Sequence, residues 1–294
     1  MAFDPRPGRV NPRPYLIAAI IAVLLLLVLL LTRRNRPEAH SPVPTQPAAG
    51  PRPARAEKQV PAVVIDRPEI PGTAGGQVIQ RAGYTLCYDE AAEQPSWVAY
   101  VLTAAEVRAA HLPRTNRFLR DPNLSTGSAD DADYEGSGYD RGHLAPAEDL
   151  SYSAATMRES FYYSNMSPQL PAFNRGTWKR LEELVRYWAA TYDSLAVVTG
   201  PVLAAGLPVI GHNAVAVPAA YYKVVLRYSA SGVEAIGFLV PHAASGSSLR
   251  TFAVPVDEVE KRTGIDFFPQ LPDSLETAVE AKLGADSWLW RRVK

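Results

Sequence analysis

The sequence predicts an α+β domain with a largely antiparallel central sheet flanked by helices and preceded by one transmembrane helix. Three observations support this prediction: an uninterrupted apolar run near the N-terminus, a proline-rich stretch after it, and a remainder in which β-branched and aromatic runs outnumber helical patterns. A chain of 294 residues suits one or two domains and can bury a sizeable core.

The N-terminal part begins with a short tail and an apolar run. Residues 1–14 form the tail, and residues 15–32 read YLIAAIIAVLLLLVLLLT, enough to cross a bilayer core of roughly 30 Å. A cleaved signal peptide and a buried core helix are the alternatives. A secretory apolar region is usually only about 7–15 residues long, and here TRRNR stands where a small-residue cleavage site would be. Since three arginines lie on each side of the run, charge does not predict its orientation.

A proline-rich segment follows the apolar run. Residues 33–72 hold nine prolines and no aromatic residue, so they cannot bury enough surface to fold, and we expect an extended tether. The folded domain is therefore expected at residues 73–294. It has a single cysteine, Cys87, which excludes an intrachain disulfide and a cysteine-rich zinc site.

Residue patterns within the domain predict six strands and three helices. The predicted strands are 84–88, 97–102, 160–165, 195–200, 221–228 and 233–240, and the predicted helices are 175–191, 256–263 and 273–283.

The net charge of zero, from 30 basic and 30 acidic residues, argues at first against a nucleic-acid-binding protein. Residues 1–62, however, hold nine basic and three acidic residues, which leaves residues 63–294 with 21 basic and 27 acidic residues and a net charge of −6. A polyanion must therefore be attracted locally. The basic cluster that would attract it consists of Arg114, Arg117, Arg120, Arg141, Arg175, Lys179 and Arg180.

One of the five histidines has a suggestive setting. His143 closes the run Asp140-Arg141-Gly142-His143, which joins a guanidinium fork to an imidazole that titrates near neutrality. The glycine would let another backbone or a phosphate approach closely. The other four, for which surface or structural roles are expected, are His40, His111, His212 and His242.

A second candidate group lies on the helix predicted from residue 175. If the helix begins near Asn174, Glu182 lies about 80° from it in projection and Glu183 points about 180° away. An asparagine oxygen beside a carboxylate suits Mg²⁺. As alternatives, Asn174 caps the helix and Glu182 pairs with Arg186. Trp178 has the spacing of a core residue.

Taken together in order, these residues resemble the DNA/RNA non-specific endonuclease family, the ββα-metal nucleases. The resemblance spans roughly residues 80–270. It is carried by DRGH at 140–143, FYYSNMSPQ at 161–169 and NRGTW at 174–178 with Leu181-Glu182, and by YTLCY at 84–88, WVAY at 97–100 and TGP at 199–201.

The resemblance implies a metal-dependent phosphodiesterase that cuts DNA, RNA or both with little sequence specificity. In it, His143 is the general base, and Arg141 neutralises charge on the phosphate. Asn174 is the direct ligand of Mg²⁺, with Mn²⁺ as a substitute, and Glu182 holds metal-bound waters. Asp140 is expected near the substrate, where it braces the loop.

Two further residues are implied on the substrate side. Arg117 is the expected phosphate contact, with Arg114 and Arg120 as competitors. Asn165 is expected as a positioning residue near the site, although a strand-end hydrogen bond explains it equally well. The alternative function is a catalytically inactive nuclease-like module, tethered to a membrane, that binds nucleic acid or another partner.

The chemistry also suggests partners and a location. A non-specific nuclease is toxic in the compartment of its own genome, so we expect a single-pass membrane protein with its domain on the extracytoplasmic side. The candidate partners are DNA, RNA, the membrane, a second copy of the chain in a homodimer and an inhibitor protein.

Overall fold

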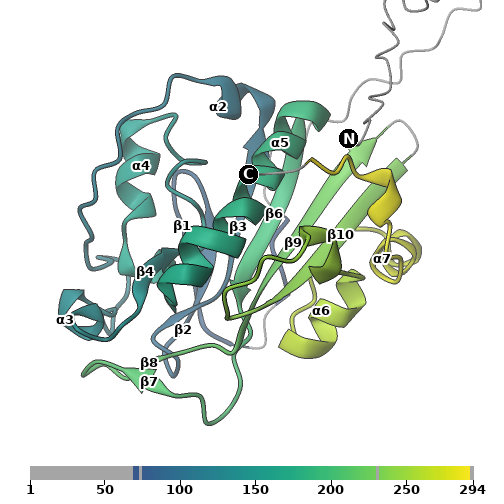
Figure 1. The fold of residues 1–294 in the computed structure, drawn as a ribbon. Helices are drawn as coiled ribbons and strands as arrows, with labels where there is room; N and C mark the ends of the chain where they lie inside the picture. The colour runs from purple at the N-terminus through teal and green to yellow at the C-terminus, as the bar shows by residue number, and fades with distance from the viewer. Residues whose placement is uncertain (1–68, 73–74, 230–231, 292–294) are drawn as a thin grey trace, which may run out of the picture. The chain divides into compact units, whose positions relative to one another are not determined.

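A seven-stranded sheet, antiparallel throughout, lies at the centre of the described chain (Figure 1). The computed structural model describes residues 69–72, 75–229 and 232–291. The sheet confirms the predicted mixed class with a central antiparallel sheet. Its strands, in spatial order, are β1 (Gln77–Gln80), β2 (Thr85–Asp89), β3 (Gln94–Thr103), β6 (Ser194–Pro201), β9 (Ala220–Ser229), β10 (Gly232–Pro241) and β11 (Ala253–Val254).

The predicted membrane span, residues 15–32, lies outside the described residues, as does most of the predicted tether. Among the residues that are described, no helix has both the length and the apolar character needed to cross a bilayer.

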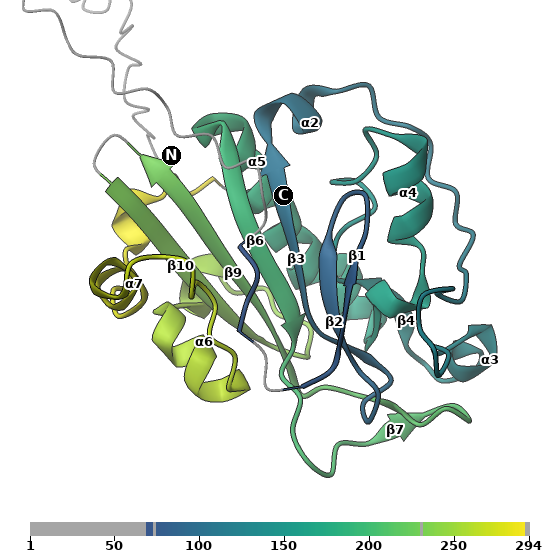
Figure 2. The ribbon, with the colours of Figure 1, turned by 180° about the vertical axis from the view of Figure 1, so that it is seen from behind.

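The sheet separates two hydrophobic clusters. Successive residues of a strand face opposite sides, so on β6 Val197 joins one cluster and Val198 joins the other. The first cluster is covered by α5 (Lys179–Tyr192), which lies in front of the sheet in Figure 1 and behind it in Figure 2. The second is covered by α6 (Val256–Thr263) and α7 (Asp273–Glu280). The helices on the two faces therefore do not share a core.

Helix α5 is held against the sheet by one apolar stripe. Leu181, Leu184, Val185 and Trp188 recur at the spacing of one helix face, and all four are fully buried. This stripe fixes the rotation of α5 and so decides which of its polar residues face away from the core.

A small ββα unit lies beside the main sheet. Strand β4 (Asp140–His143) pairs antiparallel with β5 (Met166–Gln169), and the π-helix η2 (Phe173–Trp178) then runs directly into α5. A Cβ at Gly142 would lie 2.2 Å from the side chain of Gln169, so any other residue there would have to displace that side chain. The glycine of the DRGH run therefore admits a neighbouring side chain of the protein.

The remaining elements are short. Helix α2 begins with a capping box between Thr103 and Glu106, and α6 ends at Gly264, whose φ of 71° is left-handed. These elements are α2 (Ala104–Arg108), α3 (Asp131–Tyr134), α4 (Ala154–Ser160), β7 (Val209–Ile210), β8 (Val215–Ala216) and the 3₁₀ turns η1 (Tyr163–Asn165), η3 (Leu249–Phe252) and η4 (Ala285–Ser287).

The strand predicted at residues 160–165 is wrong. This segment contains the end of α4 and the turn η1, and the strand β5 begins only at Met166. Its aromatic residues made it resemble a strand, but Phe161 and Tyr163 are buried against Phe118 from a loop far earlier in the chain. A segment rich in aromatic residues is therefore expected to be buried, but it need not be a strand.

Candidate active site

An open cleft of about 450 Å³ lies where β4, η2 and α5 meet. Arg114, Arg175 and Lys179 add positive charge to its lining. The cleft also brings together five residues identified in the sequence: Asp140, Arg141, His143, Asn174 and Glu182.

His143 is the last residue of β4 and is only 8% exposed. Its ring lies edge-on to Phe161, with 4.9 Å between the ring centres. Burial, and to a lesser extent the positive charge of Arg114, lower the pKa of His143 to about 3. The imidazole is therefore neutral at pH 7 and able to accept a proton.

Arg141 is held by two partners that are distant in sequence. Its Nε donates to the hydroxyl of Tyr163 at 2.8 Å, and its Nη2 lies 2.8 Å from the Asp131 carboxylate. The Tyr163 hydroxyl in turn donates to Asp131 at 2.5 Å, and the guanidinium lies 5.0 Å from the ring centre of Phe118. These contacts restrict the guanidinium to one position at the cleft.

Asn174 lies inside the π-helix, so it does not cap a helix. Its Nδ2 donates to Asp140 at 3.0 Å, which leaves Oδ1 as the side-chain atom able to bind a cation. Arg175 also donates to Asp140, from Nε at 2.9 Å and from Nη2 at 2.6 Å. The carboxylate of Asp140 therefore positions its protein neighbours, as expected of a bracing residue.

Glu182 lines the cleft, whereas Glu183 binds Lys179 at 3.0 Å and does not. The two glutamates thus point in the directions expected from the helical phasing. Among the described residues Glu182 makes no ion pair within 4.0 Å. Its i+4 neighbour Arg186 binds Asp149 instead, at 2.7 Å.

The positive charges of Lys223 and Arg186 act on Glu182. Burial raises the pKa of Glu182, and the charges of Lys223 and Arg186 oppose that rise. Lys223 is fully buried on β9, with its Nζ 4.8 Å from the ring centre of Trp178. Burial lowers the pKa of Lys223, and Glu182 opposes that effect. Each of these two groups thus favours the charged form of the other.

The donor atoms in the cleft suit a hard divalent cation. Oδ1 of Asn174 and the carboxylate of Glu182 are oxygen ligands, the type that Mg²⁺ takes in small number while it keeps several waters. The two groups of acidic or histidine side chains elsewhere in the described chain that could hold a metal are Asp130 with Asp133 and His212, and Asp257 with Glu260 and Glu280.

Two substrate-side residues named from the sequence lie outside the cleft lining. Arg117 is exposed, and Asn165 is fully buried. The Asn165 amide accepts from the Ala145 amide nitrogen and donates to the carbonyls of Ala145 and Ser160, each at 2.9 Å. Asn165 therefore makes hydrogen bonds near the end of β4, which is the alternative role considered for it. These bonds fix the backbone at Ala145, two residues after His143.

Of the three competing arginines, Arg114 is the one that lines the cleft. Its guanidinium lies 5.0 Å from the ring centre of Phe161, the ring that also packs against His143. Arg120 instead forms an ion pair with Asp130. Spacing alone could not separate the three, because they lie on an irregular loop without a helical or strand period.

The other residues that the sequence assigned to structural roles occupy such positions. Trp178 is fully buried and stacks on Phe173, which confirms it as a core residue. His242 accepts from the Leu170 amide nitrogen at 2.7 Å and lies 2.8 Å from the Pro218 carbonyl, so both ring nitrogens have backbone partners.

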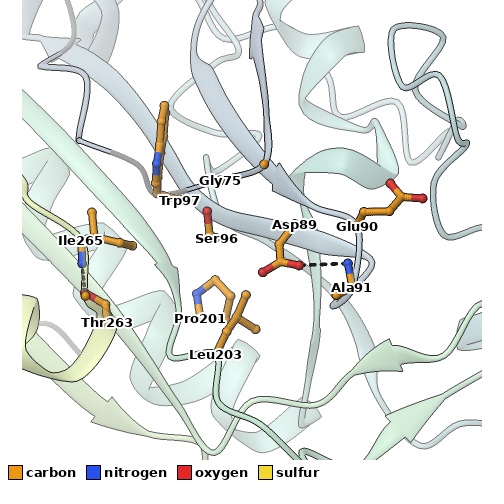
Figure 3. Close-up of a pocket in the computed structure, with 12 residues that line it drawn as sticks. Gly75, Asp89, Glu90, Ala91, Ser96, Trp97, Pro201, Leu203, Thr263 and Ile265 are labelled. Atoms are coloured by element: carbon orange, nitrogen blue, oxygen red, sulfur yellow. Dashed lines mark hydrogen bonds between the residues drawn. The ribbon is translucent and has the colours of Figure 1, made fainter.

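A second pocket, of about 530 Å³, lacks the chemistry of the cleft (Figure 3). Trp97, Pro201 and Ile265 supply apolar surface, and among the described residues no basic residue or histidine lines it. The Asp89 carboxylate accepts from the Ala91 amide nitrogen at 2.9 Å. A pocket with two acidic residues and no cation is unsuited to a phosphate chain.

The ββα unit and its cleft define the class of protein. His143 lies on the first strand, and Asn174 and Glu182 lie on the helical segment, the arrangement of the ββα-metal nucleases. A family model for the DNA/RNA non-specific endonuclease matches residues 64–274. The chain belongs to this family.

Individual relatives agree with the family match. The chain is 35% identical over 219 residues to mitochondrial endonuclease G of Bos taurus, covering 69% of this chain and 72% of that protein. It is 30% identical to the mitochondrial nuclease of Saccharomyces cerevisiae, with 68% of each protein covered. A crystal structure of the EndoG/EndoGI complex is similar at a TM-score of 0.65 and 34% identity, covering 70% of this chain and 90% of that one.

Proposed function

We propose that this protein is a metal-dependent endonuclease that hydrolyses phosphodiester bonds of DNA, RNA or both with little sequence specificity. The observation that carries the proposal is the convergence of His143, Arg141, Asn174 and Glu182 on one cleft. Membership of the non-specific endonuclease family supports the same activity.

The side chains of the cleft match the needs of hydrolysis. Neutral His143 takes a proton from the attacking water. Arg141, held by Tyr163 and Asp131, neutralises charge that grows on the non-bridging oxygens, and Arg114, which also lines the cleft, contributes to the same effect. Asn174 and Glu182 would hold a divalent cation, which when bound stabilises the leaving alkoxide.

The residues that line the cleft also suit an enzyme with little specificity for the base sequence of its substrate. Its basic side chains, Arg114, Arg141, Arg175 and Lys179, suit phosphate oxygens, which are the same at every step of a nucleic acid. Sequence discrimination requires contacts to base edges, and these residues provide no built site for a particular base.

Plasmid cleavage by the full-length chain tests the proposal. With Mg²⁺, His143→Ala should lower kcat by about 10²–10⁴-fold, because a general base is lost. His111→Ala, at an exposed histidine outside the cleft lining, should retain activity. Excess EDTA should abolish cleavage by the unaltered chain and by His111→Ala. Undiminished cleavage by His143→Ala would remove the assigned mechanism, and no metal-dependent cleavage by the unaltered chain would favour the inactive-module alternative.

We propose Mg²⁺ as the metal, with Mn²⁺ able to substitute. Support comes from the small number of protein oxygens in the cleft, which suits an ion that keeps several waters. Adding single metals back to the EDTA-treated chain tests this assignment. Activity restored by Zn²⁺ and not by Mg²⁺ or Mn²⁺ would contradict it.

We also propose that residues 15–32 anchor the protein as a single membrane span, with the domain on the extracytoplasmic side. Support comes from the length of the apolar run and from the toxicity of a free nuclease beside its own genome. Protease added to intact cells should digest the domain. Full protection until the membrane is opened would contradict the orientation.

An inhibitor protein is a further proposed partner, supported by the similar structure in which EndoG is bound to EndoGI. A homodimer is proposed as an additional assembly. Light scattering of the purified chain tests the homodimer, and a monomeric mass would exclude it.

A further inference from the structure

Three carboxylates meet between α6 and α7, the helices that pack on the sheet face opposite α5. Asp257 and Glu260 come from α6, and Glu280 is the last residue of α7. One oxygen of each lies within 4.8 Å of one oxygen of each of the others. Like charges at this separation repel strongly unless a cation or a proton lies among them.

Glu280 gives this cluster a feature that ordinary surface acids lack. Its side chain is 5% exposed, and its Oε1 is buried without a hydrogen-bond partner among the described residues. A negative charge at the C-terminal end of a helix is also opposed by the helix dipole. A buried carboxylate oxygen in such a place is normally satisfied, whereas Glu280 has two further carboxylates within 4.8 Å of one of its oxygens.

Within the described part of the chain, the charged groups that act on Glu280 are all acidic. Burial, and after it the negative charges of Glu260, Glu276, Asp266 and Asp257, raise the pKa of Glu280 to about 8. Residues 256–280 hold seven acidic and two basic side chains. Of those two bases, Arg262 pairs with Glu258 along α6.

We propose that Asp257, Glu260 and Glu280 form a binding site for a hard divalent cation, Ca²⁺ in preference to Mg²⁺. Three carboxylates from two helices supply oxygen ligands without the near-ideal octahedral geometry that Mg²⁺ demands. Glu260 keeps one oxygen for the Phe267 amide nitrogen, a 3.0 Å bond that anchors the α6–α7 connection beside the site. The bound cation clamps α6 to α7 and so stabilises the domain on the side away from the cleft.

The other candidate cluster does not carry a similar inference. Asp130 forms an ion pair with Arg120, and Asp133 accepts from both the backbone and the side-chain amide of Asn213. Protein donors already satisfy these carboxylates, whereas Oε1 of Glu280 has none within the described chain.

Thermal unfolding of the full-length chain tests the proposal. The Asn174→Ala background removes the expected direct ligand in the cleft, so metal bound there should contribute less to the measured Tm. After EDTA treatment and dialysis, CaCl₂ should raise the Tm in this background more than MgCl₂ at the same concentration, because a ligand of the folded state stabilises it. Adding Glu280→Gln should abolish the rise, whereas Glu258→Gln, also on α6, should preserve it.

Two outcomes would overturn the proposal. If Ca²⁺ leaves the Tm of the Asn174→Ala chain unchanged, Glu280 is a protonated buried carboxyl, and Glu280→Gln alone should then leave the Tm unchanged or raise it. If Ca²⁺ raises the Tm of Glu280→Gln equally, the ion binds at another place.

Equilibrium dialysis with radioactive Ca²⁺ covers the case in which Glu280→Gln fails to fold. The Asn174→Ala chain should bind one Ca²⁺, and Asp257→Asn, at an exposed ligand, should weaken that binding. Unchanged affinity in Asp257→Asn would contradict the ligand set. Mg²⁺-dependent cleavage by chains with an intact cleft should be unaffected by either substitution, which separates this site from the proposed nuclease function.

Discussion

At the scale of single residues, the environment of His143 has two consequences for catalysis. Burial lowers the pKa of His143 to about 3, which favours the neutral imidazole at pH 7 but also makes it a weaker base than one titrating near neutrality. Part of the lowering comes from Arg114, whose charge a bound phosphate would neutralise. Substrate should therefore raise the pKa of His143 at the moment when a stronger base is needed.

Arg114→Ala should make this coupling visible. Because the positive charge of Arg114 lowers the pKa of His143, its removal raises that pKa, and His143 becomes protonated at a higher pH. The acidic limb of kcat/KM should shift upward in pH but remain below about 6.5, since burial is the larger cause. KM should rise as well.

The exposed Arg117→Ala serves as the matched control and should leave the profile in place. An acidic limb that is identical in Arg114→Ala and in the unaltered enzyme would show that Arg114 does not act on the base.

The sequence predicted the residues that carry the chemistry of the site better than the residues that hold them in position. His143, Asn174 and Glu182 were identified because they are close in sequence or helical phase, and all three line the cleft. Tyr163 and Asp131, which hold Arg141, lie 22 and 10 residues from it and follow no local period. Contacts of this kind arise from tertiary packing, so no spacing rule could identify them.

At the scale of elements, the π-helix η2 refines the phasing predicted for α5. An i→i+5 turn holds one more residue in each hydrogen-bonded ring than an α turn, so each residue rotates by less than about 100°. From Asn174 to Glu182 the total rotation falls below the α-helical value and approaches two full turns. The π-helix therefore makes the angle between Asn174 and Glu182 around the helix axis smaller than it would be in a regular α-helix.

Deleting Gly176 should test the role of the π-helix. The deletion removes a residue from η2 and should rotate Asn174 by about 100° away from Asp140 and the cleft. Cleavage should fall to the level of Asn174→Ala, while the far-ultraviolet circular dichroism remains that of the folded chain.

The matched control for this deletion is Gly176→Ala, since a Cβ at this position would meet no described atom within 4 Å outside its chain neighbours and its own helix backbone. This substitution should retain activity. A deletion variant that cuts at the normal rate would show that the widened turn has no part in placing Asn174.

The two adjacent glutamates of α5 provide a second test at this scale. Glu182→Gln should weaken metal binding by about 10–100-fold, as for residues that orient metal-bound water, and should require more Mg²⁺ for half-maximal activity. Glu183→Gln should cost little, because it removes only an exposed pair with Lys179. Titration of Mg²⁺ in the cleavage assay measures both, and the reverse order would refute the observed orientation of α5.

The main sheet was easier to predict than the ββα unit. Strands β6, β9 and β10 are long, apolar and bounded by turn residues, and the strands predicted at 195–200, 221–228 and 233–240 lie within them. Strand β4 is only four residues, DRGH, and carries no apolar alternation. Strand β4 forms because β5 pairs with it. Its four residues have the side chains expected of an active site and show no pattern that predicts a strand.

At the scale of the whole molecule, the acidic excess of the domain lies mostly away from the cleft. Residues 63–294 carry a net charge of −6, and residues 256–280, which include α6 and α7, carry −5 of it. The cleft lining has four basic and three acidic side chains. The acidic domain therefore does not contradict binding of a polyanion at the cleft.

Salt should weaken substrate binding with a modest slope. If two to four of the cleft cations contact phosphate, the slope of log K against log salt should lie between about −2 and −4 for duplex DNA. Anisotropy of a labelled duplex with the His143→Ala chain measures binding without cleavage. A slope near zero would contradict recognition through phosphates, and a much steeper slope would require cations outside the cleft.

The central sheet also separates charge. Because α6 and α7 lie on one face and the cleft-bearing helix α5 on the other, the domain has an electric dipole directed across the sheet. The field of a nucleic acid should exert a torque on this dipole that turns the cleft toward the strand before any contact forms. The acidic helices α6 and α7, although they lie on the face opposite α5, should thereby help to orient productive encounters.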